Sequence, residues 1–260
     1  MPLDRILLAL STLAFLAAVV PAVAALRSGD WRRGGAQFLV MTVGFALQTA
    51  AVYYRGQVVG QCPMKSVSDV LVFIAWSVVL LYFLVGPTFR VSLLGMFTAP
   101  LVVAMHGIAF AVPDAFPDYA AKGKINAYVE MHAALALIAY AAFALACITG
   151  GMYLLQERFL KRHQISGLFY QLPPIQGLAK VIQRLVWLGV VLLSASLAIS
   201  VKLHTPVSHP HIIFAWIVWG LYTLIGLVIW RHALSPRQTA WLAAVGFTLP
   251  FISLWLVTHA

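Results

Sequence analysis

Residues 211–230 read HIIFAWIVWGLYTLIGLVIW, twenty consecutive positions without an Asp, Glu, Lys or Arg. At about 1.5 Å of rise per residue, a helix of this length is roughly 30 Å long, which matches the hydrocarbon thickness of a bilayer. A helix on the surface of a soluble protein would carry a polar stripe with a period of about 3.6 residues, and this stretch carries none. The stretch therefore predicts a transmembrane helix.

The composition of the whole chain agrees with a membrane protein. It is 62% hydrophobic and 9% charged, with a mean hydropathy of +0.93, whereas a soluble domain is about 25% charged. No segment is polar enough to form a soluble domain, so we expect a single transmembrane domain over residues 1–260. The net charge of +10 comes from 17 basic residues spread thinly over short loops. This pattern favours membrane orientation, so we expect the lipid bilayer and no nucleic acid as a partner.

The apolar stretches predict an all-α integral membrane protein, a bundle of about eight transmembrane helices. We expect the spans at about residues 3–26, 36–54, 67–87, 90–112, 128–155, 181–201, 211–231 and 237–258. The longest connection covers about residues 156–180, and the Pro173-Pro174 pair in it predicts the start of a helix. We expect that helix to begin as an amphipathic piece that lies on the membrane surface.

The Lys and Arg residues predict how the bundle is oriented. The loops after spans one, three, five and seven carry eleven of them, and the N-terminus and the other loops carry six. The positive-inside rule therefore places both termini on the outer, periplasmic side of a bacterial inner membrane. The first span ends in Ala22-Val23-Ala24, which resembles a signal-peptidase site. Because Arg27, Arg32 and Arg33 follow this stretch, we expect it to be retained as an anchor.

With this orientation, six of the eight histidines fall on or near the outer face. They are His106, His132, His204, His209, His211 and His259. A neutral imidazole is a strong ligand for transition metals and for haem iron. The alternative is that histidines at helix ends bond water, lipid headgroups or backbone, and the sequence leaves both interpretations open.

The cysteines, carboxylates and tryptophans indicate which kind of metal site the histidines could form. Cys62 and Cys147 lie at different depths, so they predict neither a disulfide nor a thiolate site. The carboxylates of the outer side are too scattered to indicate a hydrolytic zinc centre; they are Asp4, Asp69, Asp114, Asp118 and Glu130. A haem needs one or two imidazoles and an aromatic wall, which Trp216 and Trp219 could supply if they are not simply interfacial packing residues. Nothing resembles a catalytic nucleophile or an acid–base pair.

Several segments resemble the cytochrome c assembly family, which includes CcsA-, HemX- and YpjD-like membrane proteins. MHAALALIAYAAFALACITGGMYLLQERFLKR resembles the family helix that begins with a histidine, and LPPIQGLAKVIQRLVWLGVVLLSASLAI resembles the segment that follows it in the HemX and YpjD branch. HPHIIFAWIVWGLYTLIGLVIW and WLAAVGFTLPFISLWLVTHA resemble the next helix and the last one. The resemblance covers about residues 60–260.

This resemblance implies the ligands of a haem. His132 matches the histidine that leads its family helix, and His259 matches the one that ends the last span. In CcsA-type proteins these two are implied as axial ligands of a haem at the outer face, so we expect a non-covalent, b-type haem here. His204, His209 and His211 are expected to contribute to the haem site or to replace contacts that the family motif makes and this chain lacks.

The chain also departs from the family motif. Where CcsA proteins carry Trp-Asp-Pro-Lys, residues 208–211 read Ser-His-Pro-His, and the position of the family's intramembrane histidine falls near Leu227. The chain therefore looks closer to the HemX and YpjD branch, whose members are linked to haem homeostasis or act beside other membrane proteins.

Two functional hypotheses follow. The first is a haem-handling membrane protein that presents haem to a partner membrane protein or to apocytochrome c, and that is at most one part of a haem-attachment machinery. The second is a haem-free accessory or regulatory protein that supports a partner membrane complex or tetrapyrrole synthesis. A solute transporter is disfavoured, because the sequence lacks acids within the spans and paired broken helices.

Overall fold

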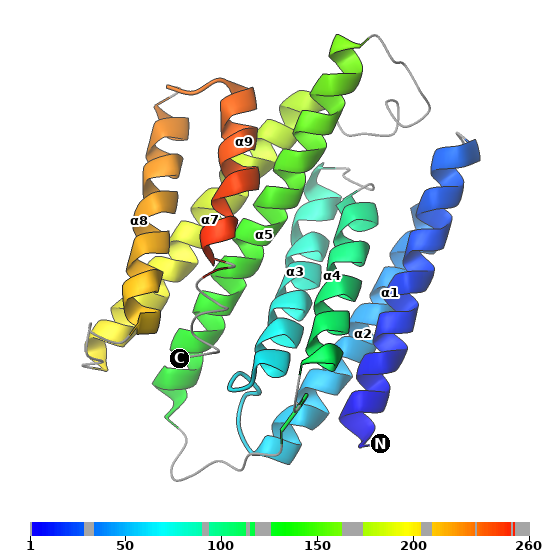
Figure 1. The fold of residues 1–260 in the computed structure, drawn as a ribbon, viewed down its shortest axis with the longest axis vertical. Coiled ribbons are helices and arrows are strands. Elements are labelled where there is room, and N and C mark those ends of the chain that lie inside the picture. Colours follow the sequence, from blue (N-terminus) through cyan, green and yellow to red (C-terminus); the bar gives the residue numbers. More distant parts are fainter. Residues whose placement is uncertain are drawn as a thin grey trace. The chain divides into compact units, whose positions relative to one another are not determined.

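The computed structural model describes residues 2–28, 34–89, 94–112, 115–117, 126–162, 174–203, 210–231, 233–250 and 252. Regular secondary structure in these ranges is entirely helical, which confirms the all-α prediction. The helices are α1 (Leu3–Ser28), α2 (Gly34–Val59), α3 (Val67–Phe89), α4 (Leu94–Ala111), α5 (Ala127–Lys161), α7 (Ile175–Lys202), α8 (Pro210–Trp230) and α9 (Pro236–Gly246), drawn in Figure 1.

Six of the helices in the described ranges, namely α1, α2, α3, α5, α7 and α8, are long and apolar enough to cross a membrane. The chain is therefore a multi-pass membrane protein. In α4 the apolar stretch is shorter and covers Phe97–Ala111. Helix α9 occupies the first half of the span predicted at 237–258, and most of the second half lies outside the described residues. The orientation of the termini stays a prediction.

Helices α2, α5 and α7 are each several residues longer than the spans predicted for them. Helix α5 has 35 residues and continues past the predicted end at residue 155, where Glu157 and Lys161 form an ion pair of 2.8 Å one turn apart. Helix α7 begins directly after Pro174 and runs unbroken for 28 residues, so the prediction of a separate piece on the membrane surface is wrong. Its apolar face, which includes Leu178 and Leu185, is buried and packs chiefly on α5 instead.

The helices group into two compact units. The first unit comprises Met1–Ile125 and Arg162–Pro173, and in it α1 packs on α2 and α4 while α3 packs on α4. The second comprises Asn126–Lys161 and Pro174–Ala260, and in it α5 packs on α7 and α9 while α8 packs mainly on α7. The expectation of a single domain over residues 1–260 stays a prediction.

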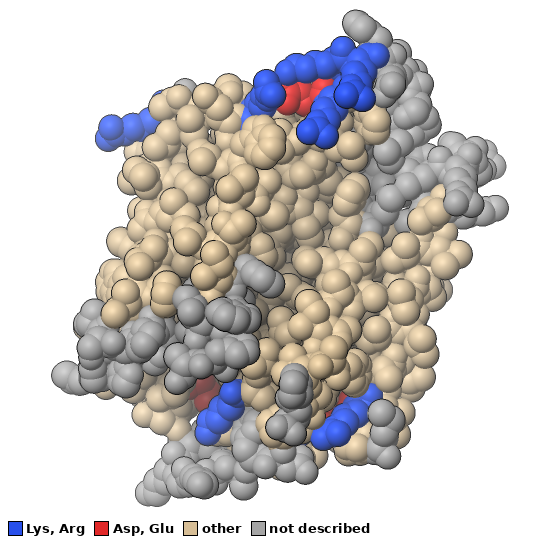
Figure 2. Space-filling view, in the orientation of Figure 1, with Lys and Arg blue, Asp and Glu red and all other residues tan. Residues whose placement is uncertain are grey.

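In the second unit, charged residues join the end of α5 to the start of α9. Glu157 pairs with Arg237 at 3.3 Å as well as with Lys161, and Figure 2 shows basic side chains gathered around an acidic one near that end of α5. Helix α9 starts there with a capping box between Ser235 and Gln238. Lys161 and Arg237 thus lie at one end of the unit, which agrees with the loop count that assigned both to one side of the membrane.

The close packing of α5 on α7 gives a first prediction, for Gly189 of α7. A Cβ atom at Gly189 would overlap the ring of Phe143 on α5. This ring cannot move aside freely, because it stacks on Tyr222 of α8 with ring centroids 3.6 Å apart and both side chains are buried. We expect Gly189→Ala to lower the free energy of unfolding by about 1–3 kcal/mol, as over-packing of a core does, measured by chemical denaturation in detergent.

A control on the same helix isolates the effect of packing. A Cβ at Gly177 of α7 meets no atom within 4 Å, so Gly177→Ala should be neutral or stabilising by up to about 1 kcal/mol through helix propensity. Equal stability of the Gly189 and Gly177 variants would contradict the close helix contact.

Candidate functional site

His132 lies in the second turn of α5, and a serine of α7 holds its ring in place. The Nδ1 atom of His132 lies 2.8 Å from the carbonyl oxygen of Ser196 and 2.9 Å from its hydroxyl oxygen. The Ser196 hydroxyl also donates to the carbonyl oxygen of His132 at 2.8 Å. Two side chains 64 residues apart in sequence are thereby fixed to each other.

This arrangement decides which nitrogen of the neutral His132 ring carries the proton. A carbonyl oxygen can only accept a hydrogen bond, so the Ser196 carbonyl requires an N–H at Nδ1. The Ser196 hydroxyl donates its one proton to the carbonyl of His132, so it can only accept from Nδ1. Both groups therefore require the proton of the neutral ring to be on Nδ1. The Nε2 atom then carries a lone pair, and no hydrogen bond to it occurs among the described residues. Metal-ligating histidines are typically held in this way, with Nδ1–H on a carbonyl and Nε2 turned to the metal.

The two predicted tryptophans lie on α8. Trp219 donates from Nε1 to the Ser194 hydroxyl of α7 at 2.7 Å, and Trp216 packs edge-to-face on Trp219 with ring centroids 5.5 Å apart. Ser194 and Ser196 are neighbours along α7 but lie about 200° apart around its axis. Trp219 and His132 therefore contact α7 at the same level and from different sides. Trp216 is 38% exposed.

His204, His209 and His259 lie outside the described residues, and for His211 the structure describes only the backbone, in the first turn of α8. Their proposed roles stay predictions.

His106 of α4, by contrast, is fully buried in the first unit and has both ring nitrogens occupied. The Thr12 hydroxyl donates its proton to the carbonyl of Leu8, so at 2.9 Å it accepts from Nδ1–H of His106. The Gln48 amide nitrogen lies 2.9 Å from Nε2 and 3.3 Å from the carbonyl oxygen of Val72, so it donates to both. His106 is a structural histidine between helices, although the sequence grouped it with candidate ligands.

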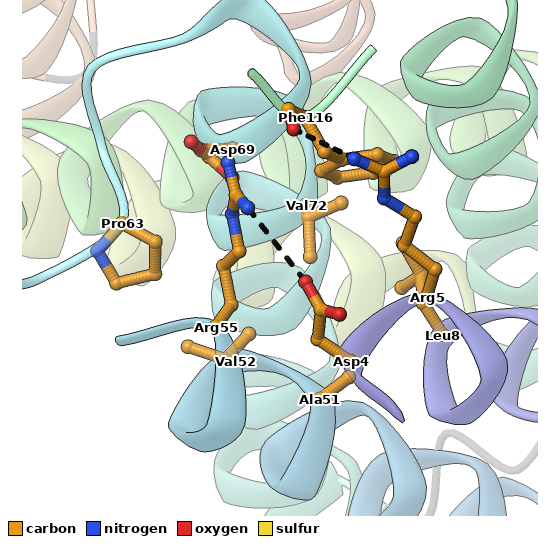
Figure 3. A pocket seen from close by; sticks show the side chains of 10 residues that line it. All are labelled: Asp4, Arg5, Leu8, Ala51, Val52, Arg55, Pro63, Asp69, Val72 and Phe116. Carbon is orange, nitrogen blue, oxygen red and sulfur yellow. Dashed lines mark hydrogen bonds and ion pairs between the residues drawn. The ribbon is translucent and has the colours of Figure 1, made fainter. Parts of the chain in front are cut away.

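The first unit also contains a buried cluster of charges that the sequence analysis did not predict, shown in Figure 3. Arg55 at the end of α2 donates from Nε to Asp69 of α3 at 3.0 Å, and its Nη1 lies 3.8 Å from a carboxylate oxygen of Asp4 on α1. The side chains of all three are at most 6% exposed. The two acids, which looked scattered along the chain, thus meet at one arginine. Opposite charges at the ends of consecutive apolar spans were the available signal.

The same arginine holds a strained piece of backbone. Phe116, between α4 and α5, has φ 56°, a conformation that costs a bulky residue about 1–3 kcal/mol. Its carbonyl accepts from Arg5 at 2.9 Å, and the next carbonyl, that of Pro117, accepts from Arg55 at 2.6 Å. Both guanidinium groups also lie within 6 Å of the Phe116 ring, at 5.9 and 5.8 Å. These contacts explain how the conformation persists.

Comparison with known proteins places the chain in a family. The sequence model described as "Cytochrome C assembly protein" matches residues 64–259. Protein HemX of Brevibacillus brevis is 27% identical over 164 residues, which are 63% of this chain and 60% of that protein. Protein HemX of Bacillus subtilis (strain 168) is 25% identical over 171 residues, 65% of this chain and 62% of that one. The matches thus span about three-fifths of each relative.

The family match covers His132 with its Ser196 anchor and all of α5, α7, α8 and α9, and it extends over about three-quarters of the sequence. This chain is a member of the cytochrome c assembly protein family.

Proposed function

We propose that the protein binds haem non-covalently at the outer face of a bacterial inner membrane, with His132 and His259 as axial ligands of the iron. One observation supports this most: the Nδ1 atom of His132 is anchored on Ser196, which leaves the lone pair of Nε2 for a ligand. His106, by contrast, has both ring nitrogens within hydrogen-bond distance of other side chains. Membership of the cytochrome c assembly protein family supports a haem-related role.

The chain's own residues would bind and cover the haem rather than react with it. Ser196 fixes the tautomer and the direction of the His132 ring, and outer-shell contacts of this kind raise the basicity of the ligand. A contribution of Trp216 and Trp219 to an aromatic surface for the porphyrin stays part of the proposal, although Trp219 contacts α7 from a different side than His132. His204, His209 and His211 are proposed to complete the site. A haem held by His132 and His259 would supply an iron whose ligands come from the protein's own imidazoles.

We further propose that haem is a cargo, which the protein presents to a partner membrane protein or to apocytochrome c. The haem-free accessory role remains the competing proposal. The altered motif at residues 208–211 favours it, because the tryptophan and the acid of the family pattern are replaced there.

Haem titration of the purified full-length chain tests this proposal. We expect a Soret band that saturates at one haem per chain, and its loss in the double variant His132→Ala and His259→Ala. His163→Ala is the control, because the loop count places that histidine on the opposite side. A wild type that stays colourless would exclude haem binding. If such a chain also co-purifies with a partner, and alanine at every outer histidine leaves that complex intact, the accessory role is correct.

Ser196 gives a second prediction. Ser196→Ala removes the hydroxyl from Nδ1 and from the His132 carbonyl but keeps the Ser196 carbonyl as an acceptor. We expect haem affinity to fall by about tenfold, the lower end of the range for outer-shell partners of a metal ligand, measured by competition with a haem-binding protein. Ser194→Ala, on the Trp219 side of α7, should change the affinity less. An equal loss in the two variants would mean that the anchor of His132 has no special role.

A further inference from the structure

One face of α7 stays exposed along the helix and changes from basic to apolar on the way. Its exposed positions recur every three or four residues, which is the spacing of a single helix face. The early turns of this face carry Lys180 and Arg184, and the next turns carry Leu188, Val191 and Ala195. We call these five residues the α7 stripe. The opposite face is buried and packs chiefly on α5.

The length of α7 places the basic part of the stripe at the depth of lipid headgroups. The helix has 28 residues and is therefore roughly 42 Å long, about 12 Å longer than the hydrocarbon core of a bilayer is thick. Lys202, exposed at the other end of α7, must reach the headgroups of the opposite surface. From there, Lys180 and Arg184 lie roughly 33 and 27 Å along the helix, so their long side chains extend into the nearer headgroup region.

The second unit carries an excess of positive charge around the basic end of the stripe. Residues 174–260 contain no Asp or Glu. Helix α7 begins with no acidic residue in its first turn and no side-chain cap, so the positive end of the helix dipole adds to the charge of the side chains. Glu157, the acid near the end of α5, pairs with Lys161 and Arg237. The basic end of the stripe is therefore complementary to an anion.

We propose that the α7 stripe binds one anionic phospholipid of the surrounding bilayer. Its phosphate contacts Lys180 and Arg184, which lie one turn apart on the same side of the helix, and an acyl chain lies over the three apolar residues. From Arg184 to Ala195 the stripe runs roughly 16 Å along the axis, close to the thickness of one leaflet of hydrocarbon, about 15 Å. The proposal is independent of haem binding.

The order of residues along the stripe distinguishes an anionic lipid from other ligands. A water-soluble anion reaches only Lys180 and Arg184, because the apolar residues of the stripe lie at hydrocarbon depth. A zwitterionic lipid covers the apolar residues equally well but brings no net charge to the two basic side chains, so it gains less from the electrostatic attraction. An anionic phospholipid presents a phosphate and a hydrocarbon chain in the order that the stripe requires.

Lipid titration of the purified, delipidated full-length chain tests the proposal. The probes are phosphatidylglycerol and phosphatidylcholine with the same acyl chains, and native mass spectrometry measures how much of each stays bound. We expect the wild type to prefer phosphatidylglycerol. The double variant Lys180→Gln and Arg184→Gln should lose about 30-fold of this preference, as expected for two basic residues at an anionic surface. The exchange Lys180→Arg and Arg184→Lys keeps both charges and should keep the preference.

The matched control is the double variant Arg158→Gln and Lys202→Gln, which removes the same net charge from exposed positions outside the stripe. It should bind both lipids as the wild type does. All four positions are exposed, so each variant should keep the melting temperature of the wild type, and a change in binding then reports on the surface rather than on the fold. An equal loss of preference in the two glutamine variants would show an effect of net charge alone and would overturn the proposal. So would a wild type that binds both lipids equally.

A soluble competitor identifies the source of the anion. sn-Glycerol 3-phosphate carries a phosphate and glycerol but no acyl chain, so it should not displace phosphatidylglycerol from the wild type at equal concentration. Displacement would show that the basic residues bind a soluble phosphate compound and that the apolar part of the stripe contributes nothing, which contradicts a lipid site.

Discussion

Replacing His132 with alanine is expected to lower the affinity of the protein for haem by more than about 100-fold. Loss of an outer-shell partner alone costs a metal site 10–100-fold, and this change removes the ligand itself. The iron should change from six-coordinate to five-coordinate, which shifts the Soret band and replaces the low-spin spectrum by a high-spin one. Absorption spectra of the haem-loaded variants measure both effects.

Added imidazole separates loss of the ligand from loss of the fold. The smaller variant His132→Gly leaves room beside Ser196, so free imidazole should restore the six-coordinate spectrum if only the ligand is missing. His106→Gln is a useful contrast, because His106 has both nitrogens bonded to the protein; this change should lower stability and leave the haem spectrum as it is. A His132→Ala protein with an unchanged spectrum would exclude His132 as a ligand.

Replacing Arg55 with leucine is expected to lower the free energy of unfolding by about 3–5 kcal/mol. The arginine is the shared partner of Asp4 and Asp69, and all three side chains are almost completely buried. Removing one member of such a cluster leaves uncompensated charge in an apolar surrounding. The change also takes a donor from the Pro117 carbonyl and so loosens the strained turn at Phe116. Chemical denaturation in detergent measures the loss.

The matched control is Arg158→Leu, since Arg158 lies exposed near the end of α5. That change should stay within about 0.5 kcal/mol of the wild type, as surface substitutions usually do. Arg55→Lys should fall between the two, because lysine keeps the charge but cannot reach two acids and a carbonyl with a planar fork. An Arg55→Leu variant as stable as the control would contradict the buried cluster.

The sequence predicted the helices well because the bilayer demands long apolar runs. Helix α8, Pro210–Trp230, lies within one residue of the span expected at 211–231. The prediction failed at the start of α7, where an amphipathic pattern was assigned to the membrane surface. The apolar face of that segment is covered by α5, and a periodic pattern by itself does not say whether lipid or another helix covers it.

The site was predictable only in part. His132 was selected by its position at the head of a family helix, but its anchor could not be read from the sequence, because Ser196 lies within an ordinary apolar run. The cluster of Asp4, Arg55 and Asp69 was missed for a related reason. Its members are far apart in the chain, and their meeting depends on how α1, α2 and α3 pack, which hydropathy does not encode.

Electron paramagnetic resonance of the ferric, haem-loaded protein tests the role of His132 most sharply. If Nε2 of His132 binds the iron, the wild type should give a low-spin signal with nitrogen couplings from two axial imidazoles. The His132→Ala variant should lose one of these couplings, while His163→Ala keeps both. A wild type with no imidazole coupling, or a His132→Ala variant with the same couplings as the wild type, would show that this histidine does not hold the haem.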